Sequence, residues 1–205
     1  MFEDREEAAA KLCLKLKSVV KDKNVVVIAL VRGGVVLGKI IADYFKAPWG
    51  ILVIKKIGAP QNSELAIGAV APGNIVYWNR DLCEQLSLSK EQKGELRKEK
   101  EEQRRAQEKL LGGKHIDFRG KSVILVDDGV ATGATVIAAG KFLKRNGAKE
   151  IILAVPVISK DILVSIKRYF DIVCILKSIY NFYAVGQFFR NFPQVENEQV
   201  IALLR

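Results

Sequence analysis

Apolar runs separated by amphipathic stretches dominate the hydropathy pattern of this chain. Runs of β-branched and aliphatic residues at 24–31, 51–54, 123–126 and 150–157 predict strands buried on both faces, as in a parallel sheet. Helical patterns follow at 34 to about 45, about 134 to 146 and 160–169, before a short strand at 172–175. This order predicts an α/β fold with a doubly wound, mostly parallel sheet that binds ligands at the carboxyl ends of its strands.

One segment, 81–114, breaks this pattern because it is rich in Lys, Arg, Glu and Gln. It predicts one or two exposed helices, in which Glu101 can pair with Arg105. Three- and four-residue spacing places several basic residues on one helix face: Lys93, Arg97, Lys100 and Arg104. Two interpretations stay open, a solvated helix with many ion pairs or, with the break at Gly112 and Gly113, a mobile cover over a ligand.

The strand at 123–126 leads two acids, Asp127 and Asp128, into a turn of small residues. Backbone N–H groups in such a turn can approach a ligand closely, and a helix begins near residue 134 whose amino terminus attracts anions. The candidate binding residues are Gly129, Val130, Ala131, Thr132, Gly133, Ala134 and Thr135. Because carboxylates do not hold a phosphate, we predict a phosphate in the turn and the acids on hydroxyl groups or a hydrated cation. A ribose phosphate satisfies both requirements.

A second candidate anion site follows the strand at 24–31. Arg32 offers a charged fork for phosphate oxygens, and Gly33 and Gly34 let the main chain turn its N–H groups toward a ligand. Alone, this triplet is more typical of a helix start with a surface arginine. Its pairing with residues 127–135 across a parallel sheet favours a ligand site.

Two lysines, Lys55 and Lys56, follow the strand at 51–54 and would face a leaving pyrophosphate. Since successive residues of a strand point to opposite sides, only one of them can face the ligand, and we predict Lys56 by a narrow margin. The alternative for both is an exposed, solvated strand end.

Two stretches of the sequence resemble a known protein family. VILVDDGVATGAT (residues 123–135) is similar to the phosphoribosyl pyrophosphate signature of type I phosphoribosyltransferases. KIGAPQNSELAIGAV (residues 56–70) resembles a subgroup of uncharacterised predicted phosphoribosyltransferases, over nearly the whole chain. Paired acids also end strands in response-regulator receivers, and Gly-rich turns occur in Rossmann-like folds. A Walker-type loop is excluded because no Gly-Lys-Ser/Thr follows.

The resemblance implies a type I phosphoribosyltransferase fold with a C-terminal hood. Residues 1–205 would form a single domain, with a core at about 20–176, the charged insertion at about 81–114 and an aromatic hood at about 179–205. It also implies an enzyme that transfers ribose phosphate from phosphoribosyl pyrophosphate to a nitrogenous base and releases pyrophosphate. Such enzymes commonly form dimers, so a homodimer is expected.

The family's roles carry over residue by residue. Asp127, Asp128, Arg32 and Lys56 would be the catalytic residues, and Gly33, Gly34, Lys55 and residues 129–135 would bind the substrate. Magnesium is the expected cofactor, held mainly through substrate phosphates, with Asp127 and Asp128 as candidate protein ligands.

The acceptor base stays open. The stretch 179–194 is rich in aromatic residues that could stack on a planar base, and VGQFFRNF within it faintly resembles the hood of six-oxopurine enzymes; packing in the core is the alternative. Those enzymes resemble each other in carrying a third acid in the phosphate loop, where this chain has Ala131. A proton acceptor for a purine nitrogen is therefore not evident.

A formal net charge of +10 raises a second hypothesis, a non-catalytic regulator that senses phosphoribosyl pyrophosphate or a nucleotide and binds RNA or DNA through 81–114. Interleaved acids and the lack of an aromatic-and-basic RNA motif favour the enzyme, without nucleic acid as a partner.

Cys13, Cys83 and Cys174 have no Cys-x-x-Cys spacing and indicate packed thiols in a reducing cytoplasm. His115, the single histidine, is expected at the surface, and neither a signal peptide nor a membrane span is expected.

Overall fold

The computed structural model describes residues 1–112 and 116–205, and its core is a five-stranded parallel sheet. The strand order is β2-β1-β6-β7-β8. The strands are β1 (Val25–Leu30), β2 (Trp49–Leu52), β6 (Ser122–Val126), β7 (Glu150–Ser159) and β8 (Ile172–Ile179). Every residue of β1 and β6 is buried, as required of strands covered on both faces. The predicted α/β fold with a mostly parallel sheet is confirmed.

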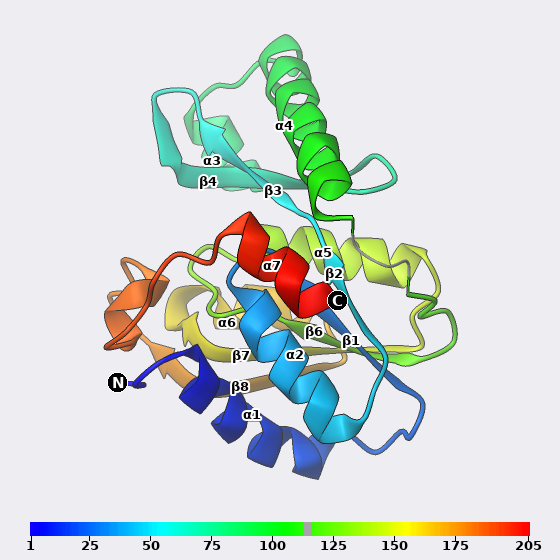
Figure 1. Ribbon diagram of the computed structural model, residues 1–205. Coiled ribbons are helices and arrows are strands. Elements are labelled where there is room, and N and C mark those ends of the chain that lie inside the picture. The colour runs from blue at the N-terminus through cyan, green and yellow to red at the C-terminus, as the bar shows by residue number, and fades with distance from the viewer. Residues whose placement is uncertain (113–115) are drawn as a thin grey trace.

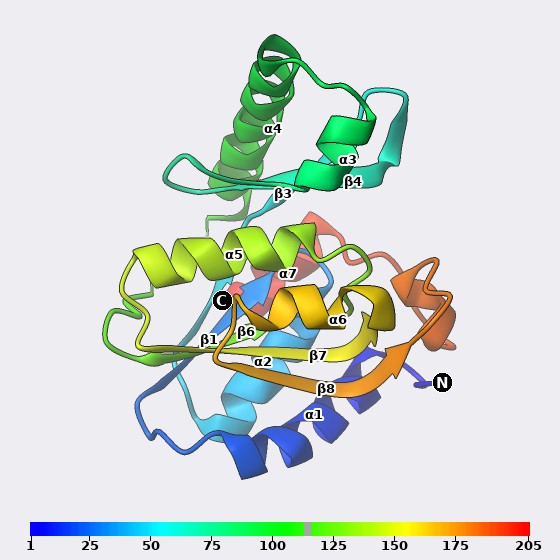
Figure 2. The ribbon, with the colours of Figure 1, turned by 180° about the vertical axis from the view of Figure 1, so that it is seen from behind.

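Helices cover both faces of this sheet (Figures 1 and 2). α1 (Arg5–Val19) and α2 (Gly34–Phe45) pack against Val25 and Val27 on one face. α5 (Ala134–Arg145) and α6 (Lys160–Lys167) pack against Val26 and Ile28 on the other. The sequence analysis did not identify α1, whose apolar stripe is blurred because Ala10 and Leu14 lie on its exposed side.

The unit inserted between β2 and β6 is larger than the charged segment from which it was predicted. It begins with an antiparallel sheet of β3 (Lys55–Ala59), β4 (Asn62–Ala71) and β5 (Ile75–Trp78), followed by α3 (Arg80–Gln85) and α4 (Lys90–Leu111). Figure 1 shows it standing above α5 and α7 (Asn197–Leu204). Only two residues separate β2 from β3, so their apolar runs merge in the sequence. Lys55 and Lys56 therefore open a new strand and do not end the preceding one.

The N-terminal segment lies beside residues 188–191 of the C-terminal tail. The N–H of Phe2 donates to the carbonyl of Phe188 (2.7 Å), and the N–H of Arg190 donates to the carbonyl of Phe2 (2.9 Å). A 3-10 helix, η1 (Val185–Phe188), precedes this contact. Phe2 packs in one apolar cluster with the tail phenylalanines Phe182, Phe188, Phe189 and Phe192. Core packing is therefore the fate of these rings, whereas Tyr180 and Tyr183 are exposed.

The cysteines follow their prediction. Cys13, Cys83 and Cys174 are buried free thiols, and burial raises the pKa of Cys13 to about 11. The expectations for Gly113 and His115 lie outside the described residues. Among the helices of the described chain, none combines the length and apolar character needed to cross a membrane.

Candidate active site

The candidate active site is built around Asp127 and Asp128, which follow β6 directly. β6 pairs with β1 on one side and β7 on the other, so its carboxyl end lies between the loops that leave those strands. The N–H of Asp127 donates to the carbonyl of Ala154 (3.4 Å), and the N–H of Asp128 donates to Oδ1 of Asp127 (2.9 Å). These bonds hold both carboxyl groups where an α/β sheet commonly binds its ligand.

The loop of Arg32, Gly33 and Gly34 lies directly against this acid pair. A Cβ atom on Gly33 would lie 1.8 Å from Oδ2 of Asp128, and one on Gly34 would lie 2.7 Å from the carbonyl oxygen of Val126. Neither position accepts a side chain unless the neighbouring loop moves. The structure thus brings together the two loops that the sequence analysis assigned to one sheet edge.

A third segment reaches the acid pair and was missed from the sequence. Arg5, the first residue of α1, donates from Nε to Oδ2 of Asp128 (2.9 Å), and its Nη2 lies 2.9 Å from the same oxygen. Its Nη1 donates to the carbonyl of Pro193 (2.8 Å), and its guanidinium carbon lies 3.6 Å from the ring centroid of Phe192. The available signal was a cation in the first turn of a helix, where the helix dipole disfavours it.

Burial and charge act differently on the two acids. The pKa of Asp127 is raised well above its usual value, first by burial and then by the negative charge of Asp128. Burial also raises the pKa of Asp128, but the adjacent Arg5 guanidinium opposes this rise. The pair therefore consists of one acid with a cationic partner and one without.

The turn after the acid pair presents free backbone donors. Val130 anchors it to the end of β7: its N–H donates to Val157 (3.0 Å) and its carbonyl accepts from the N–H of Ser159 (2.9 Å). Gly133 has a left-handed conformation (φ +79°) immediately before α5. Within residues 1–112 and 116–205, six consecutive N–H groups have no protein acceptor, those of Ala131, Thr132, Gly133, Ala134, Thr135 and Val136. With the dipole of α5, they form a set of donors suited to an anion.

The C-terminal tail rests on the same turn. A Cβ atom on Gly129 would lie 2.6 Å from Cγ1 of Val185 and 2.8 Å from Cγ2 of Val157. Glycine at this position therefore lets η1 approach the backbone of the turn. The tail therefore contacts the turn through Val185, whereas its phenylalanine rings pack in their own cluster.

Lys55 and Lys56 diverge, as expected for neighbours on a strand, and the structure places Lys55, not the preferred Lys56, beside the glycine loop. The ammonium of Lys56 lies 3.4 Å from the Glu64 carboxylate on the adjacent strand, at the exposed face of the hairpin. Lys55 instead lies beside Arg32: its pKa is lowered by burial first, then by the charges of Arg32 and Lys100. The alternation of β3 turns Lys55, and not Lys56, toward the glycine loop.

Arg32 and Lys55 line a cavity of about 380 Å³ between the core and the insertion. Its other lining residues are Ala106, Gln107, Leu110 and Asn197. Arg32 also pairs with Glu196 at 3.2 Å, next to Asn197, whose buried Oδ1 has no hydrogen-bond partner in the described part of the chain. Arg32, from the loop after β1, and Lys55, from β3, therefore meet at one end of the site, and Arg32 is paired there with the Glu196 carboxylate.

The charged helix of the insertion carries dense ion pairs. The predicted pair of Glu101 and Arg105 is present at 2.8 Å. Arg104, which is 4% exposed, binds Glu101 (2.8 Å) and Glu108 (2.9 Å). These contacts agree with the interpretation as an ion-paired helix, although Arg104 is buried and does not lie on a solvated face.

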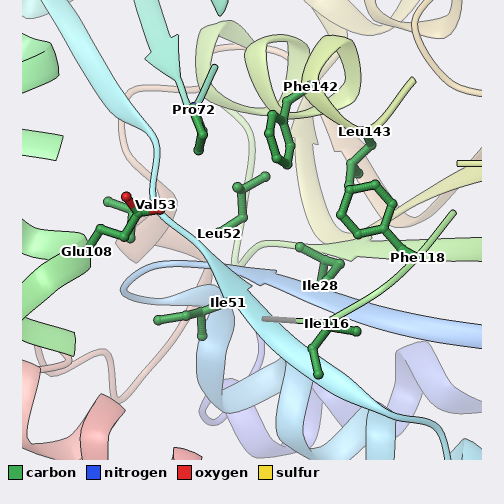
Figure 3. Close-up of a pocket in the computed structure, with 10 residues that line it drawn as sticks. All are labelled: Ile28, Ile51, Leu52, Val53, Pro72, Glu108, Ile116, Phe118, Phe142 and Leu143. Atoms are coloured by element: carbon green, nitrogen blue, oxygen red, sulfur yellow. The ribbon is translucent and has the colours of Figure 1, made fainter. Parts of the chain in front are cut away.

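A different cavity, of about 330 Å³, lies at the other side of the junction between the insertion and the core (Figure 3). It is lined by Ile28, Ile51, Leu52, Val53, Pro72, Glu108, Ile116, Phe118, Phe142 and Leu143. Among the described lining residues its one charged group is Glu108, which is already paired with Arg104. An apolar wall with a single occupied carboxylate does not suit a phosphorylated sugar.

A magnesium ion would find only part of its ligands in this protein. No group of three or more candidate metal ligands occurs among the described residues. Asp127 and Asp128 supply carboxylate oxygens, but Oδ2 of Asp128 is engaged by Arg5. This donor set fits magnesium that keeps waters and binds largely through substrate phosphates.

Comparison with known proteins agrees with this geometry. A family model described as the phosphoribosyl transferase domain matches residues 2–188. The chain belongs to the phosphoribosyl transferase domain family.

One curated relative and two solved structures are also similar to this chain. A Mycobacterium tuberculosis protein, named provisionally as a phosphoribosyl transferase, is 36% identical over 206 residues, which span 100% of this chain and 46% of the relative. The crystal structure of TT1426 from Thermus thermophilus has 30% identity and a TM-score of 0.75, covering 99% of this chain and 97% of that one. A purine phosphoribosyltransferase from Pyrococcus horikoshii shares the fold at 17% identity and a TM-score of 0.50, over 94% and 89% of the two chains. This chain therefore spans about half of the curated relative.

Proposed function

We propose that this phosphoribosyl transferase domain binds phosphoribosyl pyrophosphate with magnesium and transfers the ribose phosphate to a nitrogenous base. The supporting observation is the junction of three parts at the end of β6: the acid pair, the glycine loop against it, and the turn with unused N–H groups. One ligand that carries hydroxyl groups between two phosphate ends matches these three parts.

Each part has a role in this proposal. The N–H groups of residues 131–135 bind the 5-phosphate, and Asp127 and Asp128 accept hydrogen bonds from the ribose hydroxyls. Arg32 and Lys55 neutralise the pyrophosphate, which requires Arg32 to exchange Glu196 for the ligand. Magnesium supplies further charge neutralisation on the pyrophosphate.

In the reaction, the bond from the anomeric carbon to the pyrophosphate oxygen breaks and a bond to the base nitrogen forms. The protein contributes mainly alignment and fixed positive charge near the leaving group. Because residue 131 is alanine, the phosphate turn has no third carboxylate that could take a proton from the base. The acceptor that suits this turn best is therefore a base whose attacking nitrogen carries a free lone pair and no proton.

The proposal is tested by calorimetric titration of phosphoribosyl pyrophosphate with magnesium, followed by a pyrophosphate-release screen over purine, pyrimidine and pyridine bases. We expect binding by the wild type, loss of binding in Asp127→Asn, and release with one class of base. Absence of wild-type binding at millimolar ligand would contradict the proposal. A salt-sensitive shift of labelled RNA without turnover would favour the regulator instead.

A further inference from the structure

Arg5 is the one charged side chain that, among the described residues, reaches the acid pair from outside the two predicted loops. It is 6% exposed, and the side chain of Asp128 is 14% exposed. Nε and Nη2 of Arg5 both contact Oδ2 of Asp128 at 2.9 Å. A charged pair this deeply buried is kept only when its geometry is well satisfied.

The contact engages one carboxylate oxygen and spares the other. Within the described residues, Oδ1 of Asp128 has no hydrogen-bond donor, whereas Oδ2 accepts from Nε of Arg5 and is ion-paired with Nη2. Arginine thus fixes the rotation of this carboxyl group while it leaves an acceptor for a hydroxyl of the ligand.

The remaining contacts of Arg5 join this carboxylate to the C-terminal tail. Nη1 donates to the carbonyl of Pro193, and the guanidinium plane covers the ring of Phe192. The same tail is bound to the N-terminal segment through Phe2 and through the N–H of Asn191, which donates to Glu3 (2.8 Å). One side chain therefore links the start of α1, the tail and the sugar-binding acid.

We propose that Arg5 is a positioning residue that acts through Asp128: it orients this carboxylate for the ribose hydroxyls and locks the C-terminal tail onto the sugar site. The inference rests on the proposed function, because it takes the ribose of phosphoribosyl pyrophosphate as the ligand of Asp128. Arg5 itself does not contact the sugar in this arrangement. Its replacement therefore weakens sugar binding without affecting the pyrophosphate end.

Calorimetry of Arg5→Gln and Arg5→Lys tests this division. We expect Arg5→Gln to weaken ribose 5-phosphate and phosphoribosyl pyrophosphate binding by about tenfold or more, as for a lost charge-assisted contact, and to leave inorganic pyrophosphate binding unchanged. Arg5→Lys keeps the charge but cannot serve Asp128, Pro193 and Phe192 together, so it should recover only part of the affinity. In turnover assays, the KM for phosphoribosyl pyrophosphate should rise more than kcat falls.

Arg190→Gln is the matched control. Arg190 joins the same N-terminal segment and tail through Glu3 (3.1 Å), but both side chains are exposed and neither has a described contact with Asp128. This variant should bind ribose 5-phosphate as the wild type does. If Arg190→Gln loses as much affinity as Arg5→Gln, general loosening of the termini explains the effect and the inference is overturned.

A double-mutant cycle separates action through Asp128 from a purely structural effect. In an Asp128→Asn background, Arg5→Gln should cause a clearly smaller loss of ribose 5-phosphate binding than in the wild type, since the carboxylate it orients is gone and only its contacts with the tail remain. If Arg5→Gln alone does not fold, the cycle is run with Arg5→Lys. Additive losses, or equal loss of pyrophosphate binding, would overturn the inference alone. Failure of the wild type to bind either sugar phosphate would overturn both the proposed function and this inference.

Discussion

Asp127 and Asp128 are neighbours in the chain, but the fold gives them different surroundings. Asp128 has a buried cationic partner in Arg5, whereas Asp127 has burial and a like charge beside it. A carboxyl group with a raised pKa binds its proton more tightly in the folded than in the unfolded state. Its contribution to stability is therefore largest below the usual aspartate pKa of about 4 and decreases as the pH rises.

Asp127→Asn should remove this pH dependence. The asparagine oxygen can still accept from the N–H of Asp128, and the buried negative charge is gone. We expect the free energy of unfolding, relative to the wild type, to increase from pH 4 to pH 8, while ribose 5-phosphate binding is lost. Urea unfolding at several pH values measures this, and a variant destabilised more at pH 8 than at pH 4 would contradict it.

At Gly33, a single added Cβ atom would collide with the Asp128 carboxylate where the two loops meet. Its backbone (φ −60°, ψ −37°) is one that alanine adopts readily, so any cost of Gly33→Ala comes from the contact with Asp128. We expect destabilisation by about 1–3 kcal/mol and weaker ligand binding.

Gly94→Ala provides the control for Gly33→Ala. Gly94 lies inside α4, and a Cβ atom there would have no described neighbour within 4 Å outside the adjoining part of the helix. Alanine there should raise the free energy of unfolding by about 1 kcal/mol, because glycine is the poorer helix former. Thermal unfolding of the two variants should thus shift in opposite directions, and a shift of Gly33→Ala toward higher temperature would be inconsistent with the packed loop.

At the scale of the element, β3 decides which lysine faces the site. Lys55→Ala should weaken inorganic pyrophosphate binding, since this ammonium lies beside Arg32 in the cavity. Lys56→Ala removes an exposed pair with Glu64, worth about 1 kcal/mol or less, and should leave that affinity unchanged. Calorimetric titration of pyrophosphate distinguishes the two, and a larger loss for Lys56→Ala would restore the preference for Lys56 that the sequence suggests.

The elements also show where local pattern is a good guide. The strands at 24–31, 123–126 and 150–157 were predictable because continuous apolar runs reflect burial on both faces. The sheet β3-β4-β5 was not, because glycine and alanine in β4 blur the apolar alternation that marks a strand.

At the scale of the whole molecule, the N-terminal segment and residues 182–192 of the tail act as one packed unit. Phe189 is 5% exposed and packs on Phe2 with ring centroids 5.5 Å apart. Phe189→Ala should lower the free energy of unfolding by about 3–5 kcal/mol, as for other buried phenylalanines. Tyr183→Ala is the control, since Tyr183 is 85% exposed and a change there should stay within about 0.5 kcal/mol. Equal stability of the two variants in urea unfolding would contradict the packed unit.

The sequence by itself determined the parallel core, the acid pair and the two glycine-containing loops, because each depends on residues close together in the chain. Strand burial and turn conformation follow from local residue type, so their pattern can be recognised without knowing the fold.

Only the tertiary structure decided which distant groups meet. Arg5 reaches Asp128 across 123 positions, Lys55 meets Arg32 from another sheet, and Phe2 packs on the tail. Such contacts depend on the paths of separate elements through space, on which hydropathy along the chain carries no information. The electrostatic environment of the acid pair, and with it the proposed role of Arg5, therefore follows from the fold and not from the motif.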